Sequence, residues 1–238
     1  MAQLLVQLSD QTYPCEISNS NRARYLRLKL SHTGNLSVVV PKGVPLNKVK
    51  GFVASQAAWI ESNIKQLNPS ISDTARLEQL DLAYLGEHWD LEYFPEPASQ
   101  KIMLNPAEQH HSLQCSGRVD DIALLHKALG LWLKCKAEQV IPQRLARLAE
   151  LHGFHFNRVT IRGQKTRWGS CSAKKNINLN YKLLFLEEPV VDYVLLHELC
   201  HTIEMNHSKR FWDLVADCDD NYQEHDKQLN TLARTLPI

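Results

Sequence analysis

The chain has 238 residues, of which 44% are hydrophobic, and a formal net charge of +1 at pH 7. This length allows one large domain or two small ones, and the hydrophobic share is ample for a core. A net charge so close to zero excludes a general attraction to nucleic acid or to an anionic membrane. Nucleic acid is therefore a possible partner only through a local basic patch.

The start of the chain and its cysteines indicate a cytoplasmic protein. The segment Met1–Asp10 lacks the basic region and the long apolar core of a signal peptide, and no apolar run is long enough to span a bilayer. The six cysteines form no C-x-x-C pair, which is typical of reduced thiols. We therefore expect cytoplasmic localisation and no membrane partner.

The first elements in chain order are two hairpins and a helix. Alternating apolar residues on either side of a Thr-Gly-Asn turn predict a hairpin over Leu26–Val40. Apolar residues recur at helical spacing over Val49–Ile64, and Asn68–Ser70 is expected to end this helix. A second hairpin is predicted over Leu82–Phe94, with its turn near Gly86–Glu87.

The stretch Pro95–Gly117 is polar and predicts no clear element. We therefore expect a small N-terminal α+β domain over residues 1–117. The pattern then changes to long helices, because Ile122–Leu133 carries apolar residues on one face. Pro142 is predicted to kink or restart this helix, and Gly153 to cap its end.

A second domain is predicted over residues 118–238. Val159–Ile161 and Arg167–Leu186 have the character of strands, with a turn at Ala173–Asn176. A largely buried helix over Val190–Leu199 follows them. The overall fold class is thus α+β, with helices and a small antiparallel sheet that follow the smaller N-terminal domain.

The run His197-Glu198-Leu199-Cys200-His201 has the pattern H-E-x-x-H inside that apolar helix. Residues four apart lie on one helix face, so His197 and His201 can bind the same zinc ion. Glu198 points about 100° away along the helix circumference and remains free of the ion. Its carboxylate can then act as general base towards a metal-bound water, whose pKa the zinc lowers. The order of helix, strands and H-E-x-x-H helix over residues 118–238 is that of a zincin-like catalytic domain.

A catalytic zinc site needs a third protein ligand and an open position. His207 is the best candidate, because the chain can turn at Met205–Asn206 and bring it back. Glu204 is an alternative, although a straight helix rises about 10 Å from His197 to Glu204, too far for one ion. His225 is interpreted as a solvated helical histidine.

Four blocks around the zinc motif and three near the start carry a family resemblance. They are Lys165–Cys171, Ile177–Asn180, Tyr193–His201 and Asn206–Trp212, together with Arg22–Lys29, Val38–Gly43 and Gln56–Trp59. In this order they resemble the YgjP-like family of bacterial metal-dependent hydrolases and, more distantly, the SprT-like zinc proteases. The resemblance implies that His197, His201 and His207 bind one zinc ion per chain and that Glu198 is the base.

The sequence departs from the family after Trp212. Family members often carry a proline before an Asp-Tyr pair there, whereas this chain has Cys218-Asp219-Asp220-Asn221-Tyr222.

Basic residues gather just before the zinc helix: Arg162, Lys165, Arg167, Lys174 and Lys175. They could bind phosphate groups beside the metal, which would make a nucleotide or nucleic acid the substrate. A solvated hairpin face is the simpler interpretation, since no Gly-rich phosphate loop accompanies them. Lys165, Arg167 and Trp168 are the candidate substrate-binding residues, although Trp168 also suits a place in the core.

Three function classes follow from the sequence. The first is a zinc-dependent, metallopeptidase-like hydrolase in which Glu198 activates the attacking water. The second is a metal-dependent phosphoanhydride hydrolase of the nucleoside triphosphate pyrophosphatase type, with the basic residues neutralising phosphate charge. The third is a non-enzymatic binding module with structural zinc, which the free carboxylate of Glu198 disfavours. The expected substrate is therefore a peptide or a nucleotide.

Overall fold

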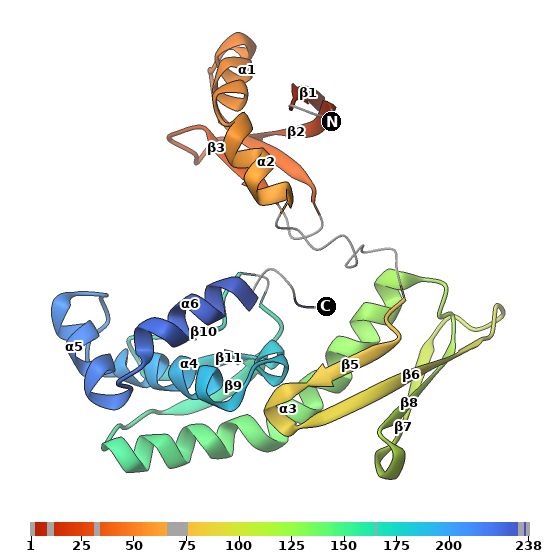
Figure 1. The fold of residues 1–238 in the computed structure, drawn as a ribbon, viewed down its shortest axis with the longest axis vertical. Coiled ribbons are helices and arrows are strands. Elements are labelled where there is room, and N and C mark those ends of the chain that lie inside the picture. The colour runs from red at the N-terminus through yellow and green to blue at the C-terminus, as the bar shows by residue number, and fades with distance from the viewer. Residues whose placement is uncertain are drawn as a thin grey trace. The chain divides into compact units, whose positions relative to one another are not determined.

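The computed structural model describes residues 3–8, 12–30, 34–65, 76–164, 166–232 and 236. Its contacts divide the chain into two compact units, Met1–Asp73 and Thr74–Ile238. Each unit has its own hydrophobic core, drawn wholly from its own residues. The two units are described separately below (Figure 1).

The first unit consists of one sheet and two helices. Its elements are β1 (Gln3–Gln7), β2 (Thr12–Ser20), β3 (Arg27–Leu30), β4 (Leu36–Pro41), α1 (Leu46–Ser55) and α2 (Ala57–Lys65). The strand order is β1-β2-β4-β3, with β2 parallel to β4 and the other neighbours antiparallel. The hairpin predicted over Leu26–Val40 is confirmed as β3 and β4. The predicted helix is divided at Gln56, and its predicted end at Asn68–Ser70 lies outside the described residues.

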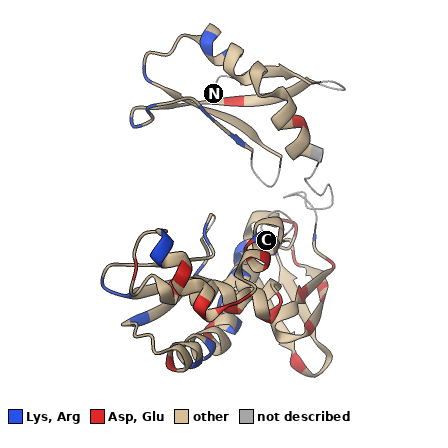
Figure 2. Cartoon of the chain, turned by 60° about the vertical axis from the view of Figure 1, so that its left-hand side comes forward, with Lys and Arg blue, Asp and Glu red and all other residues tan. Residues whose placement is uncertain are grey.

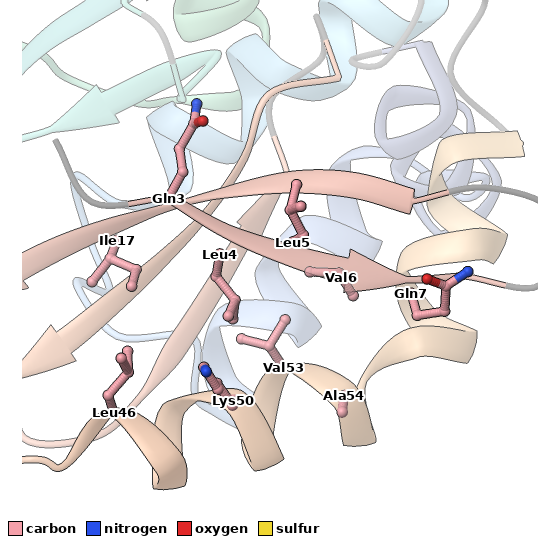
Figure 3. Close-up of a pocket in the computed structure, with 10 residues that line it drawn as sticks. All are labelled: Gln3, Leu4, Leu5, Val6, Gln7, Ile17, Leu46, Lys50, Val53 and Ala54. Carbon is pink, nitrogen blue, oxygen red and sulfur yellow. The ribbon is translucent and has the colours of Figure 1, made fainter.

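Alternation along the strands directs one set of side chains to the helices. Val38 and Cys15 are fully buried against Val49 and Val53 of α1, and Ile60 of α2 is buried with them. A groove of ≈ 610 Å³ runs between β1 and α1. In Figure 3 its wall includes Leu4, which points from β1 towards Val53. The sequence pattern predicts no strand before residue 26. The structure shows two strands there, β1 and β2.

Apart from two three-residue 3₁₀ turns, the described part of the second unit contains twelve helices and strands. They are β5 (Gln79–Leu82), β6 (Glu87–Pro95), β7 (Ile102–Ala107), β8 (Ser112–Gly117), α3 (Ile122–His152), β9 (Arg158–Arg162), β10 (Gly169–Cys171), β11 (Asn176–Asn180), the 3₁₀ helix η3 (Tyr181–Phe185), α4 (Glu188–Cys200), α5 (Lys209–Cys218) and α6 (Tyr222–Leu232). One sheet has the order β5-β6-β8-β7, and the other has the order β10-β11-β9. The end of the predicted strand block Arg167–Leu186 is not a strand, because Tyr181–Phe185 form the 3₁₀ helix η3.

The division between the units lies at residues 73 and 74, not at the predicted boundary of 117 and 118. The sheet of β5 to β8 shares one core with α3, in which Trp89 and Leu113 are buried together with Leu125 and Leu129. Strands β7 and β8 lie in the polar stretch where no element was predicted. Only alternate residues of β8 are buried, so the polar outward positions concealed the strand.

The long helix α3 supports both sheets of this unit. Asp121 caps its start by accepting a hydrogen bond from the Leu124 amide at 3.1 Å. The helix runs through Pro142 without restarting, and Figure 1 shows that it changes direction part-way along. A proline removes one helical hydrogen bond and its ring crowds the preceding turn, which accounts for a bend. Gly153 ends the helix in the left-handed conformation, with φ of 71°, as predicted.

Charge is distributed differently in the two units. The first unit has eight Lys and Arg residues against four Asp and Glu residues. In the second unit both signs are interspersed over the helices and strands (Figure 2). The first unit is therefore basic, although the net charge of the whole chain is only +1. In the described part of the chain, no helix has the length and apolar character needed to cross a membrane.

Candidate metal centre

Helix α4 carries the H-E-x-x-H run on its last turns. Pro189 occupies its first turn. Amides there form no hydrogen bond within the helix, so the lack of an N–H group in proline costs nothing. Most of its residues are buried, including Val190, Tyr193 and Leu199. This packing holds the helix rigidly, so His197 and His201 lie one turn apart on a fixed face.

The chain turns back directly after α4. The amides of Ile203 and Glu204 both donate to the carbonyl of Cys200, at 3.0 and 2.9 Å. Helix α5 then begins after Ser208, whose hydroxyl accepts from the Phe211 amide at 3.4 Å. His207 therefore sits between a tight turn and a helix cap, and it returns to the face that carries His197.

Three histidine side chains converge at this point. One ring nitrogen from each of His197, His201 and His207 lies within 4.8 Å of the others. The Nε2 atoms of His197 and His207 are 3.1 Å apart. Two nitrogens bound to one tetrahedral zinc at about 2.0–2.1 Å would be separated by about 3.3 Å. The spacing of this pair is thus close to that of two ligands of one ion.

The tautomer of His201 follows from its hydrogen bond. Its Nδ1 lies 3.0 Å from the backbone carbonyl oxygen of Glu204, which can only accept. Nδ1 therefore carries the proton, and Nε2 is left with a free lone pair. A histidine oriented in this way by a backbone carbonyl is a usual arrangement around a metal ion.

Burial favours the neutral, metal-binding form of His197 and His201 by lowering the pKa of each. Burial first, and the neighbouring His201 and His207 second, lower the pKa of His197 to about 3. Burial also lowers the pKa of His201, although its bond to the Glu204 carbonyl opposes this effect. The ring of Phe211 stacks on His201 with a centroid distance of 4.4 Å. Aromatic packing thus excludes water from one side of the cluster.

Two buried polar atoms at this site lack a hydrogen-bond partner among the described residues: Nδ1 of His197 and Oε2 of Glu198. Such atoms are rare in folded proteins, and a ligand beside the histidines would account for the unpaired Oε2 of Glu198. The spacing of His197 and His207 and the tautomer of His201 show that the residues present fit a metal ion with imidazole ligands.

Glu198 is only 6% exposed. Burial raises its pKa to about 8, and the positive charge of Arg167 acts in the opposite direction. Strand β10 packs directly against it, because a Cβ atom on Gly169 would lie 2.6 Å from both Cγ and Oε1 of Glu198. The absence of a side chain at Gly169 is therefore what leaves room for this carboxyl group.

Comparison with known proteins agrees with this geometry. The sequence matches the YgjP-like, metallopeptidase domain family over residues 24–232, which is most of the chain. The protein belongs to the YgjP-like family. Membership in this metallopeptidase family implies a metal-dependent hydrolase, and the family resemblance drawn from the sequence motifs is confirmed.

Among solved structures, the crystal structure of the metallopeptidase zymogen of Pyrococcus abyssi abylysin matches with 28% identity and a TM-score of 0.35. The match covers 37% of this chain and 90% of that one. No curated protein matches the chain.

The other residues singled out in this YgjP-like sequence have different positions. Glu204 contributes its backbone carbonyl to His201, and its carboxylate does not join the histidine cluster. His225 is not solvated as predicted: its side chain is 16% exposed, and its Nδ1 lies 2.7 Å from Oδ2 of Asp219. It is buried by the fold because α6 packs against α4. Trp168 is half-buried against the core of the second unit, Arg167 lies near Glu198, and Lys165 lies outside the described residues.

Sequence reasoning did not identify two residues that shape the site, Gly169 and Asn180. Asn180 is 2% exposed, and its amide nitrogen donates to the carbonyl oxygens of Gln164 and Arg167, at 2.7 and 2.9 Å. A possible signal was the run Asn176–Asn180, in which three asparagines occupy a strand. Asparagine is disfavoured in strands, so its presence there indicates a specific hydrogen-bonding role.

Proposed function

We propose that this protein is a zinc-dependent peptidase in which His197, His201 and His207 bind one zinc ion and Glu198 is the general base. The observation that carries the proposal is the convergence of the three histidine nitrogens within 4.8 Å, next to a buried carboxyl group on the same helix. Bound zinc would supply acidity to a water molecule and polarise the scissile carbonyl.

Glu198 moves the proton in this proposal. Its carboxylate accepts a proton from the attacking water and then delivers it to the departing amine nitrogen, which is general base and general acid catalysis by one group. Packing against Gly169 restricts the carboxyl to one place beside the histidines. Such restriction favours catalysis, because a proton acceptor must lie within hydrogen-bonding distance of its donor.

Strand β10 supports the choice of a peptide as substrate. It lies at the edge of the sheet β10-β11-β9 and pairs only with β11 among the described strands. An extended peptide could add to its free edge through backbone hydrogen bonds. Because Gly169 of β10 contacts Glu198, a peptide bound there would pass close to the proposed base.

A nucleotide phosphoanhydride is the second candidate substrate. It is favoured by Arg167, which forms no salt bridge among the described residues. Arginine suits phosphate recognition. A non-enzymatic zinc module is disfavoured, because a structural site would not require a buried carboxyl group without a partner beside three histidines.

The test is a panel of peptides and nucleoside triphosphates incubated with the zinc-loaded protein, with a chelator, and with zinc restored after chelation. We expect peptide cleavage that the chelator abolishes and zinc restores. Turnover of nucleotides with none of any peptide would replace the peptidase with the second candidate.

A further inference from the structure

A small cavity lies at the segment that leads into β10, the strand that packs against Glu198. It has a volume of ≈ 120 Å³, and its wall includes Gln164, Arg167 and Lys182. None of the described residues lining it is acidic. Since a water molecule occupies about 30 Å³ in the liquid, the space corresponds to about four waters, or to one carboxylate with its neighbouring carbons.

Asn180 builds the wall of this cavity. Its amide nitrogen holds the carbonyl oxygens of Gln164 and Arg167, and its Oδ1 accepts from the Lys182 amide at 3.2 Å. Its backbone amide also donates to the Trp168 carbonyl at 2.8 Å. One buried side chain thereby fixes both chain segments that carry the cations. The cavity is consequently a feature of the fold and not a gap between mobile loops.

The two cations of the cavity, Arg167 and Lys182, form no salt bridge among the described residues. By contrast, Arg144 in the same unit pairs with both Glu188 and Asp192. Lys182 is half-buried, and this burial lowers its pKa. A desolvated ammonium group without a counter-ion is costly, and an anion from outside the chain would offset that cost.

Gln164 also indicates which chemical groups the ligand of the cavity carries. Its Oε1 is buried and receives no hydrogen bond within the described structure. A ligand that carries an N–H group near its anionic group would satisfy both the amide oxygen and the cations. An amino acid residue with a carboxylate has both groups.

The cavity and the proposed base are connected by a short segment of chain. Arg167 and Trp168 line the cavity, and Gly169, the next residue, packs against the carboxyl of Glu198. A substrate group held in the cavity would therefore lie near the scissile bond of a peptide bound along β10.

We propose that this cavity is a specificity subsite that binds a carboxylate of the peptide substrate, through Lys182 and Arg167, next to the bond that is cleaved. The proposal rests on the peptidase function proposed above. The carboxylate can come from an acidic side chain or from the C-terminus of the peptide, and the subsite makes the enzyme prefer such peptides over neutral ones.

The test compares matched peptides with the zinc-loaded protein. One pair differs only by Asp or Asn beside the scissile bond, and another differs only by a free or an amidated C-terminus. We expect kcat/KM for the better acidic member to exceed that of its neutral partner by about tenfold or more, as for a charge-assisted hydrogen bond. The pair that shows this ratio identifies the source of the carboxylate.

The decisive variant is Lys182→Met, which keeps the length of the buried stem. It should raise KM for the acidic peptide and reduce the acidic-to-neutral ratio of kcat/KM towards one. Lys174→Met is the matched control, because Lys174 is an exposed residue of the turn between β10 and β11 and does not line the cavity. Melting temperature and zinc content show whether each variant remains folded and loaded.

A direct measurement does not depend on turnover. Calorimetric titration of the zinc-loaded protein with inorganic phosphate should show one site that Lys182→Met weakens by about tenfold or more and Lys174→Met does not. Equal effects of the two variants, or equal kcat/KM for every matched pair of cleaved peptides, would overturn the subsite.

The panel also separates the two proposals. If no peptide is cleaved but phosphate binding depends on Lys182, the peptidase function fails, and so does a carboxylate subsite. If nucleotides are then hydrolysed in a Lys182-dependent way, the anion bound in the cavity is a phosphate of that substrate, which again overturns the carboxylate assignment.

Discussion

At the scale of single residues, Glu198 combines burial with the absence of a partner for one of its oxygens. A carboxyl group in such a place would ordinarily be replaced by an apolar residue or satisfied by donors, because unpaired burial is costly. Its presence next to three converging histidines indicates a functional role. Ionisable groups whose pKa values are shifted occur frequently at active sites.

Replacing Glu198 by Gln tests that role. The amide has nearly the same shape but cannot accept the proton, so we expect zinc content to stay near one per chain while kcat/KM falls by about 10²- to 10⁴-fold. Metal analysis and steady-state kinetics on the same preparation provide the measurement. Full activity in a zinc-loaded variant would remove Glu198 from the mechanism.

Gly169→Ala should displace the same carboxyl without removing it. The added Cβ would lie 2.6 Å from Cγ and Oε1 of Glu198, so the side chain must move by several tenths of an ångström or more. We expect the zinc content to be kept and kcat to fall by about 10²-fold, as for a misplaced catalytic group. Gly51→Ala is the control, since its Cβ would meet nothing within 4 Å. Equal activity of the two variants would contradict the close packing of β10 on Glu198.

At the scale of elements, the turn between α4 and α5 completes the histidine cluster. Helix α4 and its C-terminal cap supply two histidines by helical periodicity alone, whereas the third depends on the chain reversing within a few residues. The same reversal places the Glu204 carbonyl on Nδ1 of His201. One local structure therefore both brings His207 to the cluster and orients His201.

The contrast between His207 and His225 tests this arrangement. Losing a residue that only hydrogen-bonds a metal ligand lowers metal affinity by roughly 10- to 100-fold. His207→Ala removes a proposed ligand itself, so it should lower zinc affinity by more than this. His225→Ala should leave zinc affinity nearly unchanged, because His225 pairs with Asp219 and lies outside the histidine cluster. Competition with a chromophoric chelator measures both affinities. The opposite order would show that the ligand set is wrong.

At the scale of the whole molecule, the chain consists of two units with separate cores. All members of the larger core, from Leu80 to Leu229, belong to the second unit, together with the histidine cluster and Glu198. The sheet of β5 to β8 is part of that core and not of the N-terminal unit. The catalytic unit is thus larger than the sequence pattern had predicted.

A fragment of residues 74–238 is therefore expected to fold alone. It should unfold in one cooperative transition and bind zinc with an affinity within about threefold of that of the full chain, since its core and ligands are complete. A fragment of residues 118–238 is the control, and it should be unstable because it lacks Trp89 and Leu113 of the same core. Circular dichroism with urea titration measures both. Equal stability of the two fragments would contradict the boundary at 73 and 74.

The sequence by itself determined the features that depend on near neighbours along the chain. The spacing of His197 and His201 and the position of Glu198 follow from the helical period, so they could be predicted from five residues. The hairpin of β3 and β4, the Gly153 cap of α3 and the bend expected from Pro142 follow from local turn, capping and proline chemistry in the same way. The family followed from several motifs in a fixed order.

Only the tertiary structure decided the features that join distant segments. The boundary between the units depends on β8 packing against α3, and β8 is too polar on its outer face to be recognised in isolation. The contact of Gly169 with Glu198, and the cavity that brings Arg167 and Lys182 together through Asn180, each unite segments that no periodicity connects. Such juxtapositions arise from packing and buried hydrogen bonds, whose partners are chosen by the fold and not by sequence spacing.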